Sequence, residues 1–270
     1  MGYRTGRGGQ IDGINCLSRF RLREYATRAA VVCSASDGAE IVGPGNVGWE
    51  GVAVAYGHTP PVLPGEAFTF TGVDSGGTGL RGAAIVDKVV IFWPVEDARL
   101  PVHYHLQFSS RGALTAGLYS ASAESPPLPL WPTGLGLKID DVAFAVREMR
   151  LTIESLNAKR NDTATAGVTV HEPGNLRALV EASAYFDDFR NLPRANDLVD
   201  LKLDAGDSDY WHLQWGRVNP MEPQVVLADA QGRAVGNSVD LAFHWSSVEA
   251  GTAGQIVTPA GASFWPGGGT

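Results

Sequence analysis

Few residues of this chain have the types and spacing that binding or catalytic chemistry requires. Gly77-Thr78-Gly79-Leu80-Arg81-Gly82 matches the dinucleotide-binding fingerprint Gly-x-Gly-x-x-Gly. That fingerprint binds a diphosphate where a helix follows it, because the N–H groups at the helix N-terminus hold the anion. A strand is expected here instead, at residues 85–93, so we interpret the match as a hairpin loop.

Two groups of side chains could bind a metal ion. His103 and His105 lie on one face of a predicted strand, but no third ligand lies near them in the sequence. Asp204, Asp207 and Asp209 could supply oxygen ligands for Ca²⁺, but their spacing fits no established calcium loop. We therefore interpret the histidines as solvated or interface residues and the aspartates as a solvated turn.

Catalysis has no candidate among the motifs. The chain has no Cys-x-x-Cys, no His-Glu-x-x-His, no nucleophile elbow and no P-loop. Asp187 and Asp188 are two carboxylates, but adjacent residues of a strand point to opposite faces and cannot flank one scissile bond. We predict no catalytic, cofactor-binding or metal-binding residue, and no enzyme activity.

Composition predicts a folded, mainly β protein. The 270 residues suffice for one large or two ordinary domains, and 33 Gly with 16 Pro indicate many turns and few long helices. Met1 to Gly13 has no apolar core of a signal peptide, and no stretch approaches the roughly 20 apolar residues of a membrane span. We expect synthesis in the cytoplasm, no membrane partner, and Cys16 and Cys33 as reduced thiols rather than one disulfide.

The acidic excess lies in the second half. Residues 1–118 carry 10 Lys plus Arg and 10 Asp plus Glu, whereas residues 119–270 carry 11 and 19. Proteins that grip duplex DNA usually present a basic face, because phosphate neutralisation supplies most non-specific affinity. The balance argues against gripping DNA but not against enclosing it, since an acidic wall would keep a passing polyanion from sticking.

Alternating apolar residues and turn signals divide the chain into five segments. They are a flexible N-terminal arm (1–13), a first β domain (14–118), a Pro- and Ser-rich linker (119–136), a second β domain (137–247) and a Gly- and Pro-rich C-terminal arm (248–270). Strands are predicted at residues 20–33, 52–56, 68–71, 85–93, 102–109, 143–153, 198–203, 210–215, 224–227 and 239–245. Residues 176–186 have helical spacing, but we favour a strand there, and at most one or two short helices overall.

A faint internal repeat links the two predicted domains. Gly45-Asn46 to Ala55-Tyr56 is echoed 129 positions later, without a gap, by Gly174-Asn175 to Ala184-Tyr185. Repeated units within one chain often replace two subunits of a symmetric ring. The flanking landmarks keep their order: Arg23-Glu24 and Phe108-Ser109-Ser110 in the first copy, Arg147-Glu148 and Trp245-Ser246-Ser247 in the second.

Five stretches of the first domain carry a resemblance to a known family: Gly45-Asn46-Val47-Gly48-Trp49-Glu50-Gly51, Ala55-Tyr56-Gly57-His58-Thr59-Pro60, Pro64-Gly65-Glu66-Ala67-Phe68-Thr69-Phe70-Thr71-Gly72, Ala84-Ile85-Val86-Asp87 and Phe108-Ser109-Ser110-Arg111-Gly112-Ala113-Leu114. These stretches resemble virion structural proteins of tailed bacteriophages, and within them tail tube proteins. The similarity covers residues 40–118, whereas the second domain departs strongly from it.

The resemblance implies two tandem β-sandwich or barrel domains of tail-tube type, in the tail of a virion. Their sheets would join between subunits into rings that stack as a tube, with DNA passing through without specific binding. Two domains per chain lead us to expect homotrimeric rings with pseudo-six-fold symmetry. Other tail proteins would bind the tube ends.

Two other classes of function remain open. A capsid decoration protein or a glycan-binding tail protein would use exposed tryptophans to stack on sugars, although two β cores would also absorb them. A β-fold hydrolase that uses carboxylates such as Asp187 and Asp188 is the third class. The tryptophans are Trp49, Trp93, Trp131, Trp211, Trp215, Trp245 and Trp265.

Overall fold

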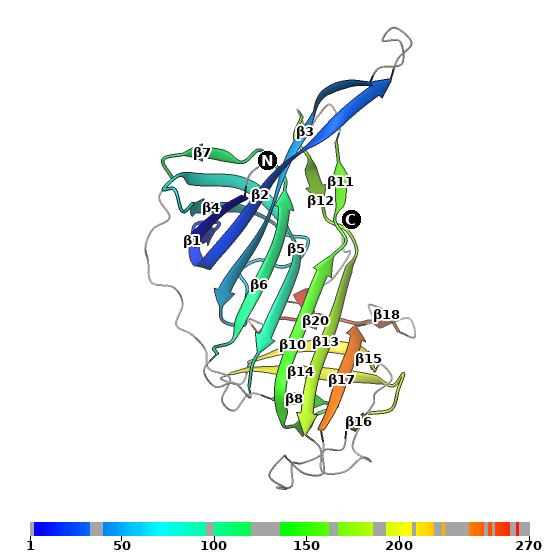
Figure 1. The fold of residues 1–270 in the computed structure, drawn as a ribbon. Coiled ribbons are helices and arrows are strands. Elements are labelled where there is room, and N and C mark those ends of the chain that lie inside the picture. Colours follow the sequence, from blue (N-terminus) through cyan, green and yellow to red (C-terminus); the bar gives the residue numbers. More distant parts are fainter. Residues whose placement is uncertain are drawn as a thin grey trace.

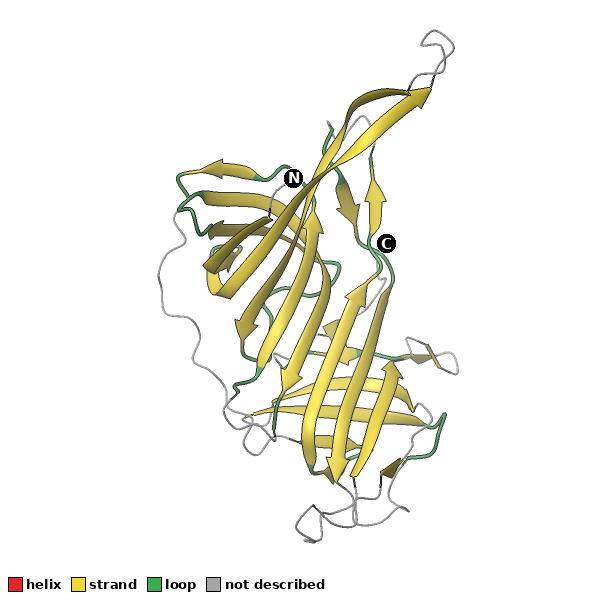
Figure 2. Ribbon diagram, viewed as in Figure 1, coloured by secondary structure: helices red, strands yellow, loops and turns green. Residues whose placement is uncertain are grey.

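The computed structural model shows a mainly β protein with one large antiparallel sheet (Figure 1). Strands make up 72% of it, and the part of the chain that it describes contains no helix (Figure 2). No helix in that part is therefore long and apolar enough to cross a membrane. The described residues are 3–32, 40–95, 100–119, 136–161, 167–185, 193–206, 209–218, 223–224, 238–245, 248–249, 252–259 and 263–264.

Seven strands belong to the first half of the chain. They are β1 (Tyr3–Ile11), β2 (Ile14–Val32), β3 (Glu40–Tyr56), β4 (Ala67–Val73), β5 (Gly79–Trp93), β6 (His103–Ser110) and β7 (Thr115–Gly117). β4 alternates apolar and polar residues, and Phe68 and Phe70 point into the core while Thr69 and Thr71 point away from it. Pairings run β1–β2–β3–β6–β5–β4 and return from β4 to β1, so six strands form a closed cycle.

The longer strands of the second half are β10 (Val146–Ser155), β13 (Leu176–Tyr185), β14 (Leu198–Gly206), β15 (Asp209–Val218) and β17 (Ser238–Trp245). The short ones are β8 (Leu137–Ile139), β9 (Val142–Phe144), β11 (Ala158–Arg160), β12 (Val170–Glu172), β16 (Pro223–Gln224), β18 (Val248–Glu249), β19 (Thr252–Ala253), β20 (Ile256–Val257) and β21 (Ser263–Phe264). The segment with helical spacing is therefore strand β13, which confirms the preference for a strand there.

Strand pairing in the second half follows the order of the first. β8 pairs with β9, which leads directly into β10, and the sequence of pairings continues β10–β13–β17–β15–β14 and returns from β14 to β8. Replacing β8, β9–β10, β13, β14, β15 and β17 by β1, β2, β3, β4, β5 and β6 gives the cycle of the first half. Even the added strands correspond, because β7 pairs with β5 as β20 pairs with β15.

The register of the paired strands agrees between the two halves, as does their order. Leu22 lies opposite Gly51 on β3, and Leu151 lies opposite Val180 on β13, with 129 residues between the members of each equivalent pair. A bulge interrupts β2 between Leu17 and Arg19, and a bulge interrupts β10 at the equivalent place, between Val146 and Glu148. Bulges bend a strand at a defined residue, so their shared position is a specific likeness between the halves.

Both halves also use the same hairpin turn. Asp12 and Gly13 have φ of 49° and 83°, and Asp140 and Asp141 have φ of 49° and 64°, as a two-residue type I′ turn requires. The Asp12 Oδ1 atom accepts a hydrogen bond of 2.7 Å from the N–H of Thr69 in β4. Asp140 Oδ1 accepts one of 2.8 Å from Asp200 in β14.

The register corrects both flanking landmarks of the repeat. Phe108 faces Gly51 and Phe243 faces Val180, so the counterpart of Phe108 is Phe243 and not Trp245. The same registers place Thr152-Ile153, rather than Arg147-Glu148, at the position of Arg23-Glu24. Ser246 and Ser247 lie outside the described residues.

Neither expected arm is free of the core throughout. β1 pairs with β2 and β4, and its Ile11 is buried, so the N-terminal segment closes the first cycle of strands. β20 pairs with β15, and Ile256 is fully buried, so residues 252–259 also belong to a core. One apolar residue at the right place anchors each segment, although its mean apolar content is low. Of the expected linker, only residues 119 and 136 lie within the described part.

Candidate assembly surface

The match to the dinucleotide-binding fingerprint lies in a β-hairpin. The Gly77 to Gly82 match lies at the turn between β4 and β5, where Asp74 Oδ1 accepts hydrogen bonds from the N–H groups of Gly76 and Thr78. Gly77 has a φ of 83°, which a side chain would strain. The interpretation as a hairpin loop holds for Gly77 and Thr78, whereas Gly79 to Gly82 already belong to strand β5, which follows the turn in place of a helix.

His103 and His105 lie on one face of β6, where the His103 ring stacks on Phe92 of β5 and the His105 ring contacts it at a tilt. Their rings are 5.1 and 5.0 Å from the Phe92 ring, and His103 Nδ1 donates to the carbonyl of Pro101 over 2.9 Å. Burial, with smaller contributions from His103 and Arg19, lowers the pKa of His105. No group of three or more possible metal ligands occurs among the described residues.

The other candidate side chains are packed or lie outside the described part. Trp49, Trp93, Trp211 and Trp245 are buried, whereas Trp215 is half-buried with a φ of 65°. Cys16 is a buried free thiol, and burial raises its pKa to about 11. Of the predicted acidic loop, the structure describes the side chain of Asp204 but not those of Asp207 and Asp209. Cys33, Trp131, Asp187, Asp188 and Trp265 also lie outside it.

The most distinctive feature is the seam between the halves, where β5 pairs with β10. Ile91 lies opposite Leu151, and Trp93 lies opposite Met149, in an antiparallel ladder from Lys88 to Trp93. These four side chains are buried. The seam joins β2, β3, β6 and β5 to β10, β13 and β17 as one curved sheet, visible as adjacent arrows in Figure 1.

A polar network fastens one end of the seam. The Asp87 carboxylate accepts hydrogen bonds from Ser109 (2.5 Å) and from Asn157 Nδ2 (2.7 Å), and Asn157 also donates to the carbonyl of Val86. Burial raises the pKa of Asp87, while the two hydrogen bonds oppose that effect. Asn157 belongs to the second half, so these bonds connect the halves through side chains.

Further contacts cross between the halves on both sides of this network. His171 Nδ1 donates to the carbonyl of Ser110 over 3.0 Å, and Arg111 forms an ion pair of 2.9 Å with Glu172. Trp211 Nε1 donates to the carbonyl of His58 over 2.9 Å. Because these bonds involve buried or half-buried groups, they favour one fixed arrangement of the two halves.

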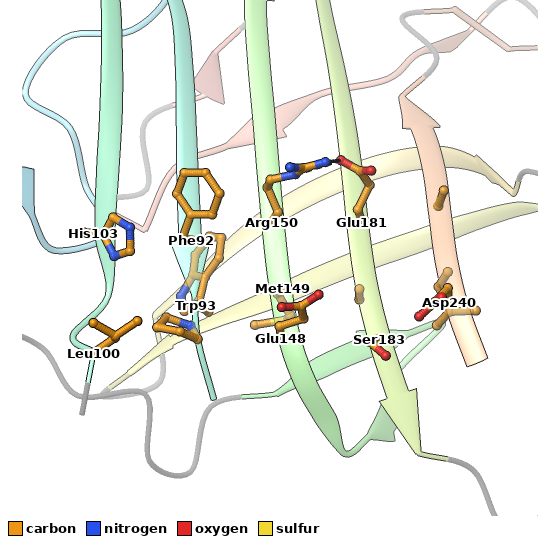
Figure 3. A pocket seen from close by; sticks show the side chains of 14 residues that line it. Phe92, Trp93, Leu100, His103, Glu148, Met149, Arg150, Glu181, Ser183 and Asp240 are labelled. Carbon is orange, nitrogen blue, oxygen red and sulfur yellow. Dashed lines mark hydrogen bonds and ion pairs between the residues drawn. The ribbon is translucent and has the colours of Figure 1, made fainter. Parts of the chain in front are cut away.

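The face of this sheet that points away from the core carries aligned rows of side chains. Figure 3 shows part of it, a shallow hollow of about 520 Å³ where Phe92, His103, Arg150 and Glu181 come from four neighbouring strands. One row crosses six strands with mainly apolar or weakly polar residues: Arg19, Val54, His105, Val90, Thr152 and Leu179.

Charges on this face are mostly paired across strands. Arg23–Glu50, Arg150–Glu181 and Arg177–Glu154 are directly opposite in register and form ion pairs. Exposed pairs of this kind contribute little to stability, about 0–1 kcal/mol each. Each of these pairs adds no net charge to this face.

β2 and β3 extend beyond the rest of the sheet as a two-stranded arm (Figure 1). β1 covers β2 only as far as Arg23, and β6 covers β3 only as far as Glu50. Val47 makes one parallel bridge to Val168, through hydrogen bonds to Gly167 and Thr169. Two-stranded ribbons are only marginally stable alone, and open edges tend to pair with other chains.

Comparisons with known proteins identify no relatives. No family model matches the chain, and no curated protein matches it. The described residues offer open strand edges and a broad sheet face, and no group of three or more possible metal ligands. The sequence indicated the apolar strands 85–93 and 143–153 but carried no signal that they pair with each other.

Proposed function

We propose that this protein is a structural subunit of a bacteriophage tail tube, with two tandem tube-type β domains in each chain. The observation that carries the proposal is the repeated cycle of strand pairings with equal register in β2–β3 and β10–β13. Two like units in one chain provide two like positions around a ring. Three chains would then provide six.

The seam between the halves supports the same proposal. β5 and β10 join two copies of the pairing cycle edge to edge, which is how neighbouring units of a ring would share one continuous sheet. The arm of β2 and β3 offers further edges to neighbouring rings. Burial of Trp49, Trp93, Trp211 and Trp245 favours this function over a glycan-binding module, because a sugar would need exposed indole rings.

In this proposal the protein resides in the virion tail after synthesis in the host cytoplasm. Its partners are further copies of itself and other tail proteins at the tube ends, and DNA passes through the lumen without specific binding. The protein has no enzymatic role.

Electron microscopy of the purified protein tests the proposal. Class averages should show stacked rings with three-fold symmetry and six similar positions around the lumen. True six-fold rings of the full chain, or particles that stay monomeric at every concentration tested, would refute it. Binding of the protein to glycans on an array, together with monomeric particles in the micrographs, would instead support the binding module.

A further inference from the structure

β10 and β2 occupy equivalent places in the two halves, but different strands pair with their equivalent edges. On β10, Arg150 and Leu151 face Phe92 and Ile91 of β5. Their counterparts on β2, 129 positions earlier, are Arg21 and Leu22, and these face Thr5 and Arg4 of β1. The N-terminal strand therefore lies on β2 where the other half of the molecule lies on β10.

The strand that would fit the β2 edge is found at the opposite end of the sheet. Ile91 and Phe92 face Tyr104 and His103 on β6, and β16 (Pro223–Gln224) faces Val239 and Ser238 on β17 in the corresponding register. β16 is thus the counterpart of the part of β5 that binds β10. Among the described residues, β16 pairs with β17 alone, so its other edge has no strand partner there.

We propose that β2, where Tyr3 to Arg7 now cover it, accepts β16 of a second copy, and that residues 3–8 leave this edge when the copies join. The new joint would repeat the register of β5 and β10, with Gln224 facing Arg21 and Pro223 facing Leu22. This inference rests on the proposed function, because it specifies how one chain of the ring joins the next. Since the two surfaces differ, repeated joining is head-to-tail and can close a ring.

Residues 3–8 contain no buried side chain, unlike β5, which occupies the equivalent place on β10. Tyr3, Thr5 and Arg7 are exposed, and Arg7 lies directly opposite Arg19, a like-charge pair that destabilises the ladder. The ion pair from Arg4 to Glu24 is more than one-third exposed on both side chains. A second ion pair from Arg4 to Asp74 (3.1 Å) and a hydrogen bond from the N–H of Ser75 to the carbonyl of Thr5 (2.7 Å) would break when residues 3–8 leave β2. By contrast, β5 buries Ile91 and Trp93 against β10.

The backbone of β1 changes direction just after residues 3–8. Gly8 has a φ of 72°, and the register of β1 with β2 shifts between Gly9 and Gln10. Beyond the shift, Ile11 is buried and pairs with Phe70 of β4. Residues 3–8 can therefore swing away while Ile11 keeps the first cycle of strands closed.

A cover of this kind has a physical purpose. An open edge pairs readily with available strands, so a bare β2 would join other chains at lower protein concentration and with less selectivity. A tethered strand occupies the edge at high effective concentration, and only a partner that gains additional contacts displaces it. Ring closure by the correct partner supplies such contacts.

A reversible lock tests the inference. Thr5→Cys with Arg21→Cys places two thiols at directly opposed positions of β1 and β2, within reach of a disulfide. The control, Gln10→Cys with Asn15→Cys, joins the same strands beyond residues 3–8, on the side that Ile11 anchors. Both variants carry Cys33→Ser, and ring content is measured by electron microscopy and sedimentation before and after reduction, with melting temperature as the test of folding.

We expect the oxidised Thr5–Arg21 lock to abolish rings, reduction to restore them, and the oxidised control to form rings like wild type. Rings at the wild-type level from a fully oxidised Thr5–Arg21 lock would overturn the inference and leave the proposed function intact. Absence of rings from wild type and control alike would overturn both. A chain that starts at Gly9 and melts like wild type should form rings at lower protein concentration, and a need for higher concentration would also overturn the inference.

Discussion

Truncation of Leu151 to alanine tests whether the seam couples the two halves. Leu151 is fully buried and lies between Ile91 of β5 and Val180 of β13. Leu→Ala at such a site removes buried methyl groups and leaves a cavity, which costs about 2–5 kcal/mol of unfolding free energy. For a chain of this size, about 3 kcal/mol lowers the melting temperature by roughly 6–12 °C.

Differential scanning calorimetry measures the shift. Because Leu151 packs against both halves, we expect one transition that moves as a whole. The matched control is Thr152→Ala, the next residue of β10, which lies on the open face and is half-buried. Its expected effect is within about 0.5 kcal/mol.

Two results would refute this reasoning. A loss of less than about 1 kcal/mol for Leu151→Ala would mean that the seam is not tightly packed around this side chain. Two separate transitions, of which only one moves, would mean that the halves melt independently and that β5–β10 pairing does not couple them.

Three further predictions concern other features of the fold. Asp12→Ala and Asp140→Ala each remove an equivalent hydrogen bond to the opposite strand, so each should cost about 1 kcal/mol in urea denaturation, and a silent variant at either site would contradict the equivalence of the turns. Burial raises the pKa of Asp87 above its ordinary 3.8, so the folded protein keeps that proton at higher pH than the unfolded chain. The unfolding free energy of wild type relative to Asp87→Asn should therefore fall as pH rises above 3.8. A constant or rising difference would contradict this. Ile256→Ala should cost about 2–5 kcal/mol because the side chain is fully buried, whereas an unchanged melting temperature would return residues 252–259 to the status of a free arm.

Most strands were predictable because apolar and polar residues alternate clearly along them. The run from Ile85 to Trp93 is too apolar for an exposed strand, and it forms the C-terminal part of β5, which has neighbouring strands on both sides. β1 was not predicted, because Gly6, Gly8 and Gly9 hide its alternation. Asp12-Gly13 between two isoleucines was an available hairpin signal for it.

The repeat could be recognised in the sequence only across segments in which neither copy has inserted residues. The 129-residue offset holds from β2–β3 to β10–β13, but the equivalent positions of β6 and β17 are 135 residues apart. Matching Phe108 to Trp245 followed residue type and missed Phe243 by two positions. The partner of β5 was beyond sequence reasoning, since an apolar run shows that a strand is buried but not which strand lies beside it.

The seam also determines how a ring of this protein would come apart. In a ring of three such chains, three of the six junctions are bridged by covalent chain, and only the other three separate when subunits leave. A broken β5–β10 ladder remains tethered and re-forms without a search through solution, because its strands stay at high local concentration. If chains join as proposed, subunit exchange within a ring would therefore proceed through the β2 and β16 edges and leave the β5–β10 ladder intact.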